Sequence, residues 1–459
     1  MCLCAFSFTA CGKDGNDGKK EEDDNPYEGK EPGNEDPPDE YDEEVFADEK
    51  GMLFSAVIQD GETVAYKVKS IGTCKDKHVV IPSQFSGLPV TQIAKNAFDG
   101  SSITAVTLPD SITYIGGSAF ARCEKLERMF VSSVESWCGT VLENMASSPM
   151  YFASELCVDS VLVTDLTIPN SVTAIPSYAF YESKNIESVT VGEGVTHIGD
   201  GAFYNCTHLE SVTIGGAIES MGELAFASCT ALTAVNIAEG VKEIGYYAFF
   251  ECESLTEVTI PSSVKSIGES AFAFCISLEK VKFKEGVEYL GDCAFGGCAA
   301  LEEFIMPQSV TEIGFGVLMF VGGYLYDGEE TFSPNRLKKI VMSDNLTEIS
   351  QYAFSGTMIE SITIGDRVET IDYSSFYLCE WLESVVISKS VKKIVSYAFY
   401  RTSINTVYYE GTADEWKKVS IGRYNDVSTA EIYYYSAVKP TKSGNFWHYS
   451  SDGVTPVKW

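Results

Sequence analysis

The sequence predicts a repeat solenoid that is mainly β, with short helical turns and about 12 coils of 22–23 residues. The first observation is an Ala-Phe pair whose phenylalanine returns every 23 residues, five times in succession, from Phe180 to Phe295. The second is the pattern around each pair, C-x-x-L-x-x-V-x-I-P-x-x-V-x-x-I-G-x-x-A-F. The third is size, because a unit this short cannot bury its own apolar side chains. Neighbouring units must therefore cover one another, and a stack of coils follows.

Each coil is expected to contain two strand-like segments and a turn. In the unit 252–272, Leu255, Val258 and Ile260 are followed by Pro261. The apolar residues alternate with polar ones at the end of this run, which indicates a short strand, and the proline ends it. The Val-x-x-Ile-Gly segment predicts a second short strand or a turn, and Ala-Phe-x-x-Cys predicts a helical turn. Parallel strands of adjacent coils should lie about 4.8 Å apart.

These units resemble the BspA-like leucine-rich repeats of bacterial surface proteins. The resemblance extends from about Val45 to the C-terminus. It includes the segments 81–98, 130–152, 408–419 and 444–449. In these units the cysteine precedes the strand, whereas an asparagine or cysteine follows it in the common leucine-rich consensus. The resemblance implies a right-handed superhelix and cell-surface adhesion or binding, without identifying a ligand.

The first 44 residues are expected to lie outside the solenoid. Residues 1–11 read as a truncated lipoprotein signal, because the sequence F-T-A-C that ends at Cys11 resembles a bacterial lipobox. Cys11 is therefore the predicted lipidation site, although the basic start of a secretory signal is missing and an ordinary start with an unrelated cysteine is the alternative. Residues 12–44 contain 15 acidic and 4 basic residues and no aliphatic residue. This composition predicts a disordered acidic tether, or an acidic tail without a function of its own.

The remainder divides into a cap, a solenoid and a second cap. Residues 45–92 are expected to hold a cap hairpin around Asp60-Gly61, together with the first repeat. Residues 93–407 are the leucine-rich-repeat solenoid, with insertions at about 124–166 and 319–336. The first insertion is interpreted as a hairpin that leaves the stacking continuous. Residues 313–326 are uncharged and fit either a repacked coil or an exposed interface. Residues 408–459 are rich in aromatic residues and are predicted to plug the end of the stack.

Cysteines recur three residues after the anchor phenylalanine of the Ala-Phe pair. In other copies this slot holds serine, threonine or valine, so we interpret it as a position for a small buried side chain. Zinc sites need paired cysteines two to four residues apart, and the spacing here does not supply them. We therefore expect a structural ladder, with no metal and no cofactor. Its members are Cys123, Cys206, Cys229, Cys252, Cys275, Cys298 and Cys379.

Charge and motifs narrow the possible functions. The chain has 66 acidic and 33 basic residues, a net charge of −33, which argues against nucleic acid as a partner. It contains 4 histidines and none of the common hydrolase or phosphate-binding motifs, so an enzyme is not expected. No apolar run reaches the roughly 18 residues of a membrane helix. A lipid on Cys11 would then be the only contact with a membrane.

A ligand is expected on the outward side of the stacked strands. Most of this row is serine and threonine, but one stretch mixes charges with exposed aliphatic residues. The candidate ligand-binding residues are Lys280, Lys282, Glu303, Ile305, Lys339 and Val341.

The sequence therefore predicts a non-catalytic, extracellular protein, lipid-anchored at a bacterial cell surface, that binds a host or extracellular-matrix protein. The alternative is a glycan-binding surface protein that uses C-terminal aromatics such as Trp447. A secreted hydrolase is the least favoured hypothesis. The oligomeric state stays open.

Overall fold

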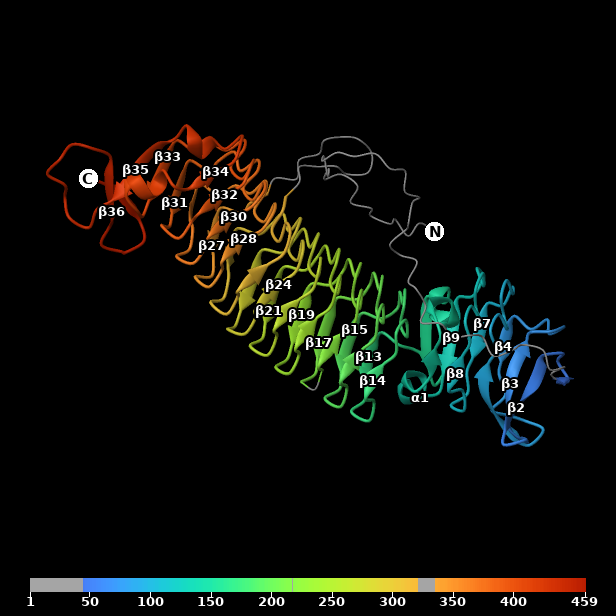
Figure 1. Ribbon diagram of the computed structural model, residues 1–459. Coiled ribbons are helices and arrows are strands. Elements are labelled where there is room, and N and C mark those ends of the chain that lie inside the picture. The colour runs from blue at the N-terminus through green and yellow to red at the C-terminus, as the bar shows by residue number, and fades with distance from the viewer. Residues whose placement is uncertain (1–43, 217, 321–334) are drawn as a thin grey trace, which may run out of the picture. The chain divides into compact units, whose positions relative to one another are not determined.

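The computed structural model describes residues 44–216, 218–320 and 335–459. Cys11, residues 12–43 of the acidic segment and most of the insertion 319–336 lie outside the described residues. In the described part the chain winds as a mostly-β solenoid of about 15 turns with very little helix. Successive coils lie side by side in sequence order (Figure 1).

A typical coil contributes one strand to each of two parallel sheets. Strand β21 (Glu257–Ile260) belongs to the first sheet and β22 (Ser266–Ile267) to the second. One coil later, β23 (Lys280–Phe283) pairs in parallel with β21, and β24 (Tyr289–Leu290) pairs in parallel with β22. Both predicted strand segments of the repeat are therefore present, and the second is only two residues long.

The first sheet runs through the stack in four sections. Its strands are β4 (His78–Val80), β7 (Ala105–Thr107), β9 (Arg128–Val131), β11 (Glu155–Val158) and β12 (Val161–Leu162); β13 (Asp165–Ile168), β15 (Ser188–Val191), β17 (Ser211–Ile214), β19 (Ala234–Ile237), β21 and β23; β25 (Glu303–Ile305) and β27 (Lys339–Val341); and β29 (Ser361–Thr363), β31 (Ser384–Ile387), β33 (Thr406–Tyr409), β35 (Glu431–Tyr435), β36 (Phe446–Tyr449) and β37 (Pro456–Lys458). We call the outward side of this sheet the strand face.

The second sheet has three sections. Its strands are β1 (Val45–Ala47), β2 (Leu53–Gln59), β3 (Glu62–Ser70), β5 (Gln84–Phe85), β6 (Leu88–Ile93), β8 (Tyr114–Ile115) and β10 (Val141–Leu142); β14 (Ala174–Ile175), β16 (His197–Ile198), β18 (Ser220–Met221), β20 (Glu243–Ile244), β22, β24 and β26 (Glu312–Ile313); and β28 (Glu348–Ile349), β30 (Thr370–Ile371), β32 (Lys393–Ile394) and β34 (Ser420–Ile421). Helices α1 (Val134–Cys138) and α2 (Ala413–Trp416) and the 3-10 turns η1 (Met145–Ser147), η2 (Pro149–Tyr151) and η3 (Asp426–Ser428) complete the described elements.

The Ala-Phe segment is a run of tight turns in place of the predicted helical turn. The Phe203 and Asn205 N–H groups donate to Ala225 and Ala227 carbonyls of the next coil, both at 2.8 Å. The intervening N–H of Tyr204 donates to the carbonyl of Gly201 in its own turn at 3.1 Å. Alternate donors thus leave the coil, which an α-helix does not permit. The segment forms a third set of hydrogen bonds between coils.

Stacked phenylalanines form the centre of one continuous core. The rings of Phe203 and Phe226 lie 5.0 Å apart and almost parallel, and Phe226 to Phe249 and Phe249 to Phe272 follow at 5.4 and 5.2 Å. All of these side chains are fully buried and belong to the same hydrophobic cluster. This confirms that coils cover one another, as the repeat predicted.

The estimate of 12 coils was low, because it counted Ala-Phe pairs. In the coil of β9 and β10, the carbonyl that accepts from the Phe120 N–H belongs to Ala146, in a segment without the pair. In the coil of β33 and β34, the Asn425 side chain accepts from the Phe399 N–H at 2.9 Å. These coils lack the anchor phenylalanine, so a count of Ala-Phe pairs misses them.

The insertion at 124–166 contains a coil of its own, and then a hairpin. Strands β9 and β10 join the preceding coil, and β11 and β12 form an antiparallel pair. Here both sheets are interrupted: β10 and β12 are the last strands of their sections, and β13 and β14 begin the next. Side chains connect the two sections. The Trp137 indole N–H donates to the Ala179 carbonyl at 2.9 Å, and the Asn185 amide accepts from Leu156 N and donates to the carbonyls of Leu156 and Val163.

Caps of different construction flank the stack. At the first, β2 and β3 form a hairpin in which Asp60 and Gly61 have φ values of 54° and 83°. At the second, β37 pairs antiparallel with β36, which places Pro456 and Lys458 on the last strand. Proline and lysine on an edge strand discourage pairing with another chain. No helix in the described part of the chain is long and apolar enough to cross a membrane.

Candidate binding face

The six candidate ligand-binding residues meet on the strand face of three adjacent coils. They alternate with buried neighbours such as Phe304 and Ile340, because successive strand side chains point to opposite sides. Lys280 and Lys282 come from β23, Glu303 and Ile305 from β25, and Lys339 and Val341 from β27. Residues up to 61 positions apart therefore share one surface.

The charges on this face pair with one another. The Lys282 ammonium lies 2.7 Å from the Glu257 carboxylate, and Lys339 lies 3.3 Å from Glu303. The hydrogen bond from Lys282, with the charge of the same group, lowers the pKa of Glu257. Exposed pairs of this kind add little stability, about 0–1 kcal/mol. The patch is thus electrically mixed, as the sequence indicated, and the structure adds which charges are paired.

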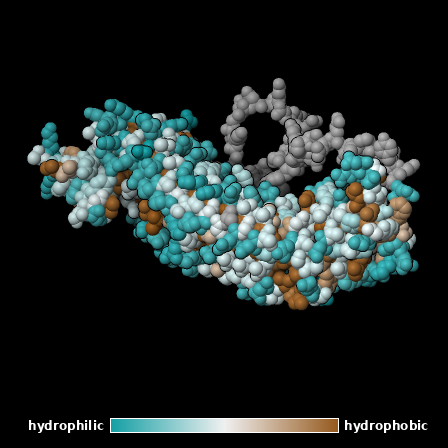
Figure 2. Space-filling view, turned by 90° about the horizontal axis from the view of Figure 1, so that it is seen from below, coloured by the Kyte–Doolittle hydropathy of each residue, from teal (hydrophilic) through white to brown (hydrophobic). Residues whose placement is uncertain are grey.

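Two exposed aliphatic side chains lie beside these pairs. Ile305 and Val341 are directly opposite in the ladder between β25 and β27, and they are 44% and 39% exposed. On the face seen in Figure 2, hydrophobic residues form scattered patches on a mainly hydrophilic surface. Because the neighbouring charges are already ion-paired, a partner can cover this aliphatic pair with a small free-energy cost of desolvation.

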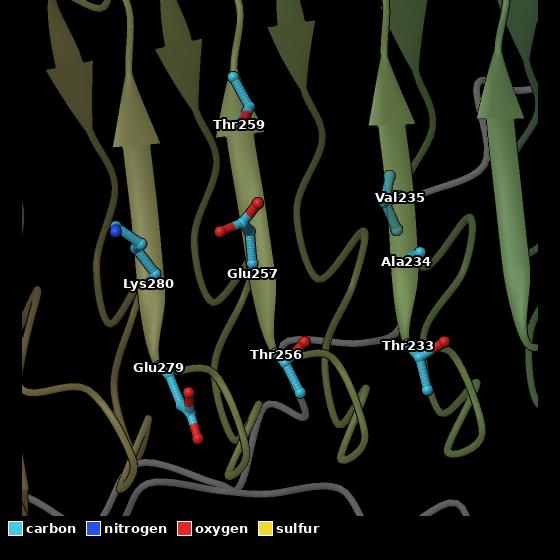
Figure 3. Close-up of a pocket in the computed structure, with 8 residues that line it drawn as sticks. All are labelled: Thr233, Ala234, Val235, Thr256, Glu257, Thr259, Glu279 and Lys280. Atoms are coloured by element: carbon cyan, nitrogen blue, oxygen red, sulfur yellow. The ribbon is translucent and has the colours of Figure 1, made fainter.

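A notch of about 390 Å³ opens on the same face, one coil earlier. It spans three adjacent strands, and Figure 3 shows Glu257 on the middle strand and Lys280 on the next, with the Lys280 ammonium directed away from Glu257. Ala234 explains the hollow, because its register partners in the neighbouring coils are the longer Ser211 and Glu257. The residues that line it are Thr233, Ala234, Val235, Thr256, Glu257, Thr259, Glu279 and Lys280.

The ladder also loosens at the notch. Strands β19 and β21 are paired at only two positions, whereas β17 and β19 are paired at four. Val235 is correspondingly only partly buried, while Val258 opposite it is fully buried. Lys280 had been singled out from the sequence, but the notch around it had not. The one sign of the notch in the sequence is Ala234, which stands at a repeat position that holds longer side chains in the neighbouring coils.

The chemistry available on this face is that of binding. Threonine hydroxyls, two carboxylates and an ammonium group line the notch, and they suit hydrogen bonds and ionic contacts. In the described ranges, no group of three or more His, Cys, Asp or Glu residues could hold a metal ion. The notch is at the small end of ligand pockets, which span about 300–1,000 Å³.

The cysteine slot lies in the core and has a second property besides size. The Cys206 thiol donates to the Phe180 carbonyl at 3.2 Å, and Cys229 and Cys275 make the same bond to Phe203 and Phe249. The other four ladder cysteines, Cys123, Cys252, Cys298 and Cys379, bond in the same way to Phe98, Phe226, Phe272 and Phe354. Burial raises the pKa of Cys298 to about 12, so the thiol stays protonated. The slot therefore holds a small side chain, and where that side chain is cysteine its thiol adds a hydrogen bond to the preceding coil.

Two of the C-terminal aromatics, Trp447 and Trp416, are not available for the glycan surface considered from the sequence, whereas Tyr435 and Trp459 are 40% and 42% exposed. Trp447 is fully buried, and its indole N–H donates to the Tyr409 carbonyl at 3.0 Å. Trp416 is also buried. These residues fill the end of the core, because the last coils have no further coil to cover them. Trp447 therefore cannot present its ring to a sugar.

The fold and its outward strand face define a solenoid of the leucine-rich-repeat class. Residues 69–157, 153–273, 242–320 and 327–421 match the family described as BspA type Leucine rich repeat region. The chain belongs to this family. No curated protein is similar enough to this chain to count as a relative.

Several solved structures are similar to this chain. A leucine rich cell surface protein from Faecalibacterium prausnitzii is 24% identical, with 82% of this chain and 97% of that chain covered and a TM-score of 0.45. A leucine-rich repeat protein from Bacteroides ovatus is 20% identical over 86% of this chain and 100% of its own, with a TM-score of 0.44. The pneumococcal vaccine antigen PcpA is 16% identical over 86% and 94%, with a TM-score of 0.42.

Proposed function

We propose that this chain is a non-catalytic cell-surface binding protein whose strand face, from β19 to β27, takes a host or extracellular-matrix protein. One observation carries the proposal: Ile305 and Val341 form an exposed aliphatic pair, flanked by charges that are already paired. Protein interfaces combine an apolar centre with a polar rim in this way. Membership of a family that resembles bacterial surface proteins is consistent with it.

The notch beside Lys280 extends the surface. A partner side chain could enter it and meet hydroxyl, carboxylate and ammonium groups, which supply direction and selectivity. In the column of β15 and β17, by contrast, the outward residues are serine and threonine. The proposed binding surface is therefore local and covers a few coils.

Binding measurements with the full chain test this proposal. Surface plasmon resonance against purified extracellular-matrix proteins should show at least one specific partner. Ile305→Asp and Lys280→Glu should each weaken that binding at least tenfold. The first places a charge that the partner would have to desolvate, and the second reverses the charge that the partner meets beside the notch. Thr190→Asp is the matched control, since Thr190 is exposed on β15 of the same face, two coils before β19. Equal binding by all four proteins, or binding to no matrix protein, would exclude the proposed face.

The proposed location includes a lipid on Cys11, with the acidic segment as a tether between lipid and solenoid. One acyl chain holds a protein only marginally, so stable anchoring requires more than one chain on that residue. Mass spectrometry of the N-terminal peptide of the exported protein tests this. An acylated Cys11 is expected, and an unmodified Cys11 would remove the anchor from the proposal.

A further inference from the structure

Six tyrosines from the last third of the solenoid form one aromatic surface. We call this surface the tyrosine plate; it consists of Tyr352, Tyr373, Tyr377, Tyr397, Tyr400 and Tyr424. The residues lie on the turns that follow the short strands, which is a different side of the coil from the strand face. None of them was singled out by the sequence pattern.

The rings contact one another from coil to coil. Tyr352 lies 5.8 Å from Tyr373, Tyr373 lies 5.5 Å from Tyr397, and Tyr397 lies 4.8 Å from Tyr424. A second row connects to the first, with 6.0 Å between Tyr377 and Tyr400 and 6.2 Å between Tyr400 and Tyr424. Mixed tilted, stacked and edge-on angles hold each ring in place. The plate is therefore rigid before any ligand arrives, which lowers the cost of binding.

The local backbone explains why these side chains point outward. Tyr352, Tyr397 and Tyr424 have φ values of 55°, 64° and 58°, in the left-handed region that glycine adopts most easily. Glycine stands in the equivalent turn at Gly201 and Gly316, with φ values of 55° and 57°. The turn directs the tyrosine away from the core and the following phenylalanine into it. The same positive φ recurs in this turn at Ser118, Leu224 and Ser270, so it belongs to the repeat, and a tyrosine placed there gains an outward ring.

The plate is not needed to close the core. The phenylalanines of the same coils, Phe354, Phe376 and Phe399, are fully buried and already fill it. The five tyrosines other than Tyr424 are partly buried, and Tyr424 is 59% exposed. Aromatic rings that stay partly exposed and lie together mark a candidate binding site, with Tyr424 as its most accessible ring.

We propose that the tyrosine plate binds an uncharged, unbranched glycan chain. Tyrosine is suited to sugars because it offers an apolar ring to the C–H face of a pyranose and a hydroxyl to its hydroxyl groups. One ring per coil matches a polymer with one sugar per step, since an extended chain of equatorially linked pyranoses has a repeat close to the spacing of coils. Arg401 and Arg423 are exposed beside the plate and add hydrogen-bond donors.

Charge decides between classes of glycan. The chain carries a net charge of −33, which repels a polyanion such as a uronic-acid polymer over long range. A neutral chain meets no such barrier. The plate therefore adds a second ligand class to a protein whose strand face is proposed for a protein partner.

Two measurements on the full chain test the proposal. The first is affinity electrophoresis in gels that contain hydroxyethyl cellulose, and the second is calorimetric titration with cellohexaose. Retardation is expected, and Tyr424→Ala and Tyr397→Ala should each weaken binding at least tenfold. Tyr424→Phe should retain most of it, since the ring is kept. Tyr246→Ala is the matched control, because Tyr246 is 54% exposed and lies outside the plate. Lys280→Glu on the strand face should also leave glycan binding unchanged.

Thermal melting of each variant separates a folding defect from the loss of a ligand contact. Tyr424 is exposed enough that its replacement should not cause a folding defect. Equal retardation of Tyr424→Ala and Tyr246→Ala would overturn the proposal. So would binding to no neutral polysaccharide when a soluble β-glucan, a xylan and a mannan are tested in turn. Stronger retardation by carboxymethyl cellulose than by the neutral polymer would contradict the choice of an uncharged ligand.

Discussion

The thiol of Cys275 donates a hydrogen bond to the backbone carbonyl of Phe249, 26 residues earlier, at 3.2 Å. The donor follows the anchor phenylalanine of its own coil and reaches that of the preceding coil. It is a second hydrogen bond to this buried carbonyl, which also accepts from the Cys252 N–H at 3.3 Å, and it joins the two coils. The same bond recurs through the ladder, so the cysteine is a fixed part of the joint between repeats.

Replacing this donor should destabilise the stack. Cys275→Ala removes one of two hydrogen bonds to the Phe249 carbonyl, which keeps the bond from the Cys252 N–H at 3.3 Å, and we expect a loss of about 0.5–1.5 kcal/mol in the free energy of unfolding. Cys275→Thr should cost less, because threonine, which stands in the same slot at Thr357, is a small side chain that keeps a hydroxyl donor. Urea denaturation followed by circular dichroism measures both. Equal midpoints for the alanine and threonine variants would show that size alone matters.

The central phenylalanines should be the most sensitive positions. Phe249→Ala removes a fully buried ring that stacks on Phe226 and Phe272 at 5.4 and 5.2 Å, and we expect about 3–5 kcal/mol of destabilisation. Phe274→Ala is the matched control, since Phe274 is 43% exposed. Differential scanning calorimetry compares the two. A similar drop in melting temperature for both would contradict the role of the ring stack.

Acid should remove a specific contribution to stability at Glu239. The hydrogen bond from Lys284 leads the interactions that lower its pKa from 4.5 to about 2. A depressed pKa in the folded state stabilises the protein above the ordinary pKa, and this stabilisation is lost as the pH falls toward the folded value. Glu239→Gln should therefore be less stable than the wild type at pH 7, and most of this difference should be lost as the pH falls to about 2. Denaturation midpoints across this range, with Glu210→Gln as an exposed control, give the result; an undiminished difference near pH 2 would contradict it.

The joint after the first insertion should open before the rest of the stack. There the Asn185 side chain, with the Trp137 indole, bridges two sections of sheet. Asn185→Ala removes three hydrogen bonds, so we expect faster amide exchange in β11 and β12 and little change in β21. Hydrogen–deuterium exchange with mass spectrometry resolves these segments. Uniform acceleration along the chain would indicate that the joint is no weaker than other contacts between coils.

The repeat made most of the architecture predictable, because its spacing repeats a local rule. Leu255, Val258 and Ile260 alternate as a strand should, and Phe272 returns at the same distance as its neighbours, so a stack with an inward phenylalanine follows. The same alternation placed Lys280, Ile305 and Val341 on one outward face. The prediction of a helical turn for the Ala-Phe segment was wrong. Alternate N–H groups of that segment donate to carbonyls of the next coil, and no pattern within one repeat reveals this.

The amino-acid sequence by itself determined that short units stack, which side chains enter the core and which strand residues face outward, since periodicity is a local property. The tertiary structure alone decided the number of coils, the notch at Ala234, the burial of Trp447 and the gathering of Tyr352 and Tyr424 into one plate. These features depend on what the neighbouring coil places opposite each residue. Some coils lack the anchor phenylalanine, and the turn positions vary from repeat to repeat. The sequence pattern therefore does not predict how these residues meet, and packing between coils decides it.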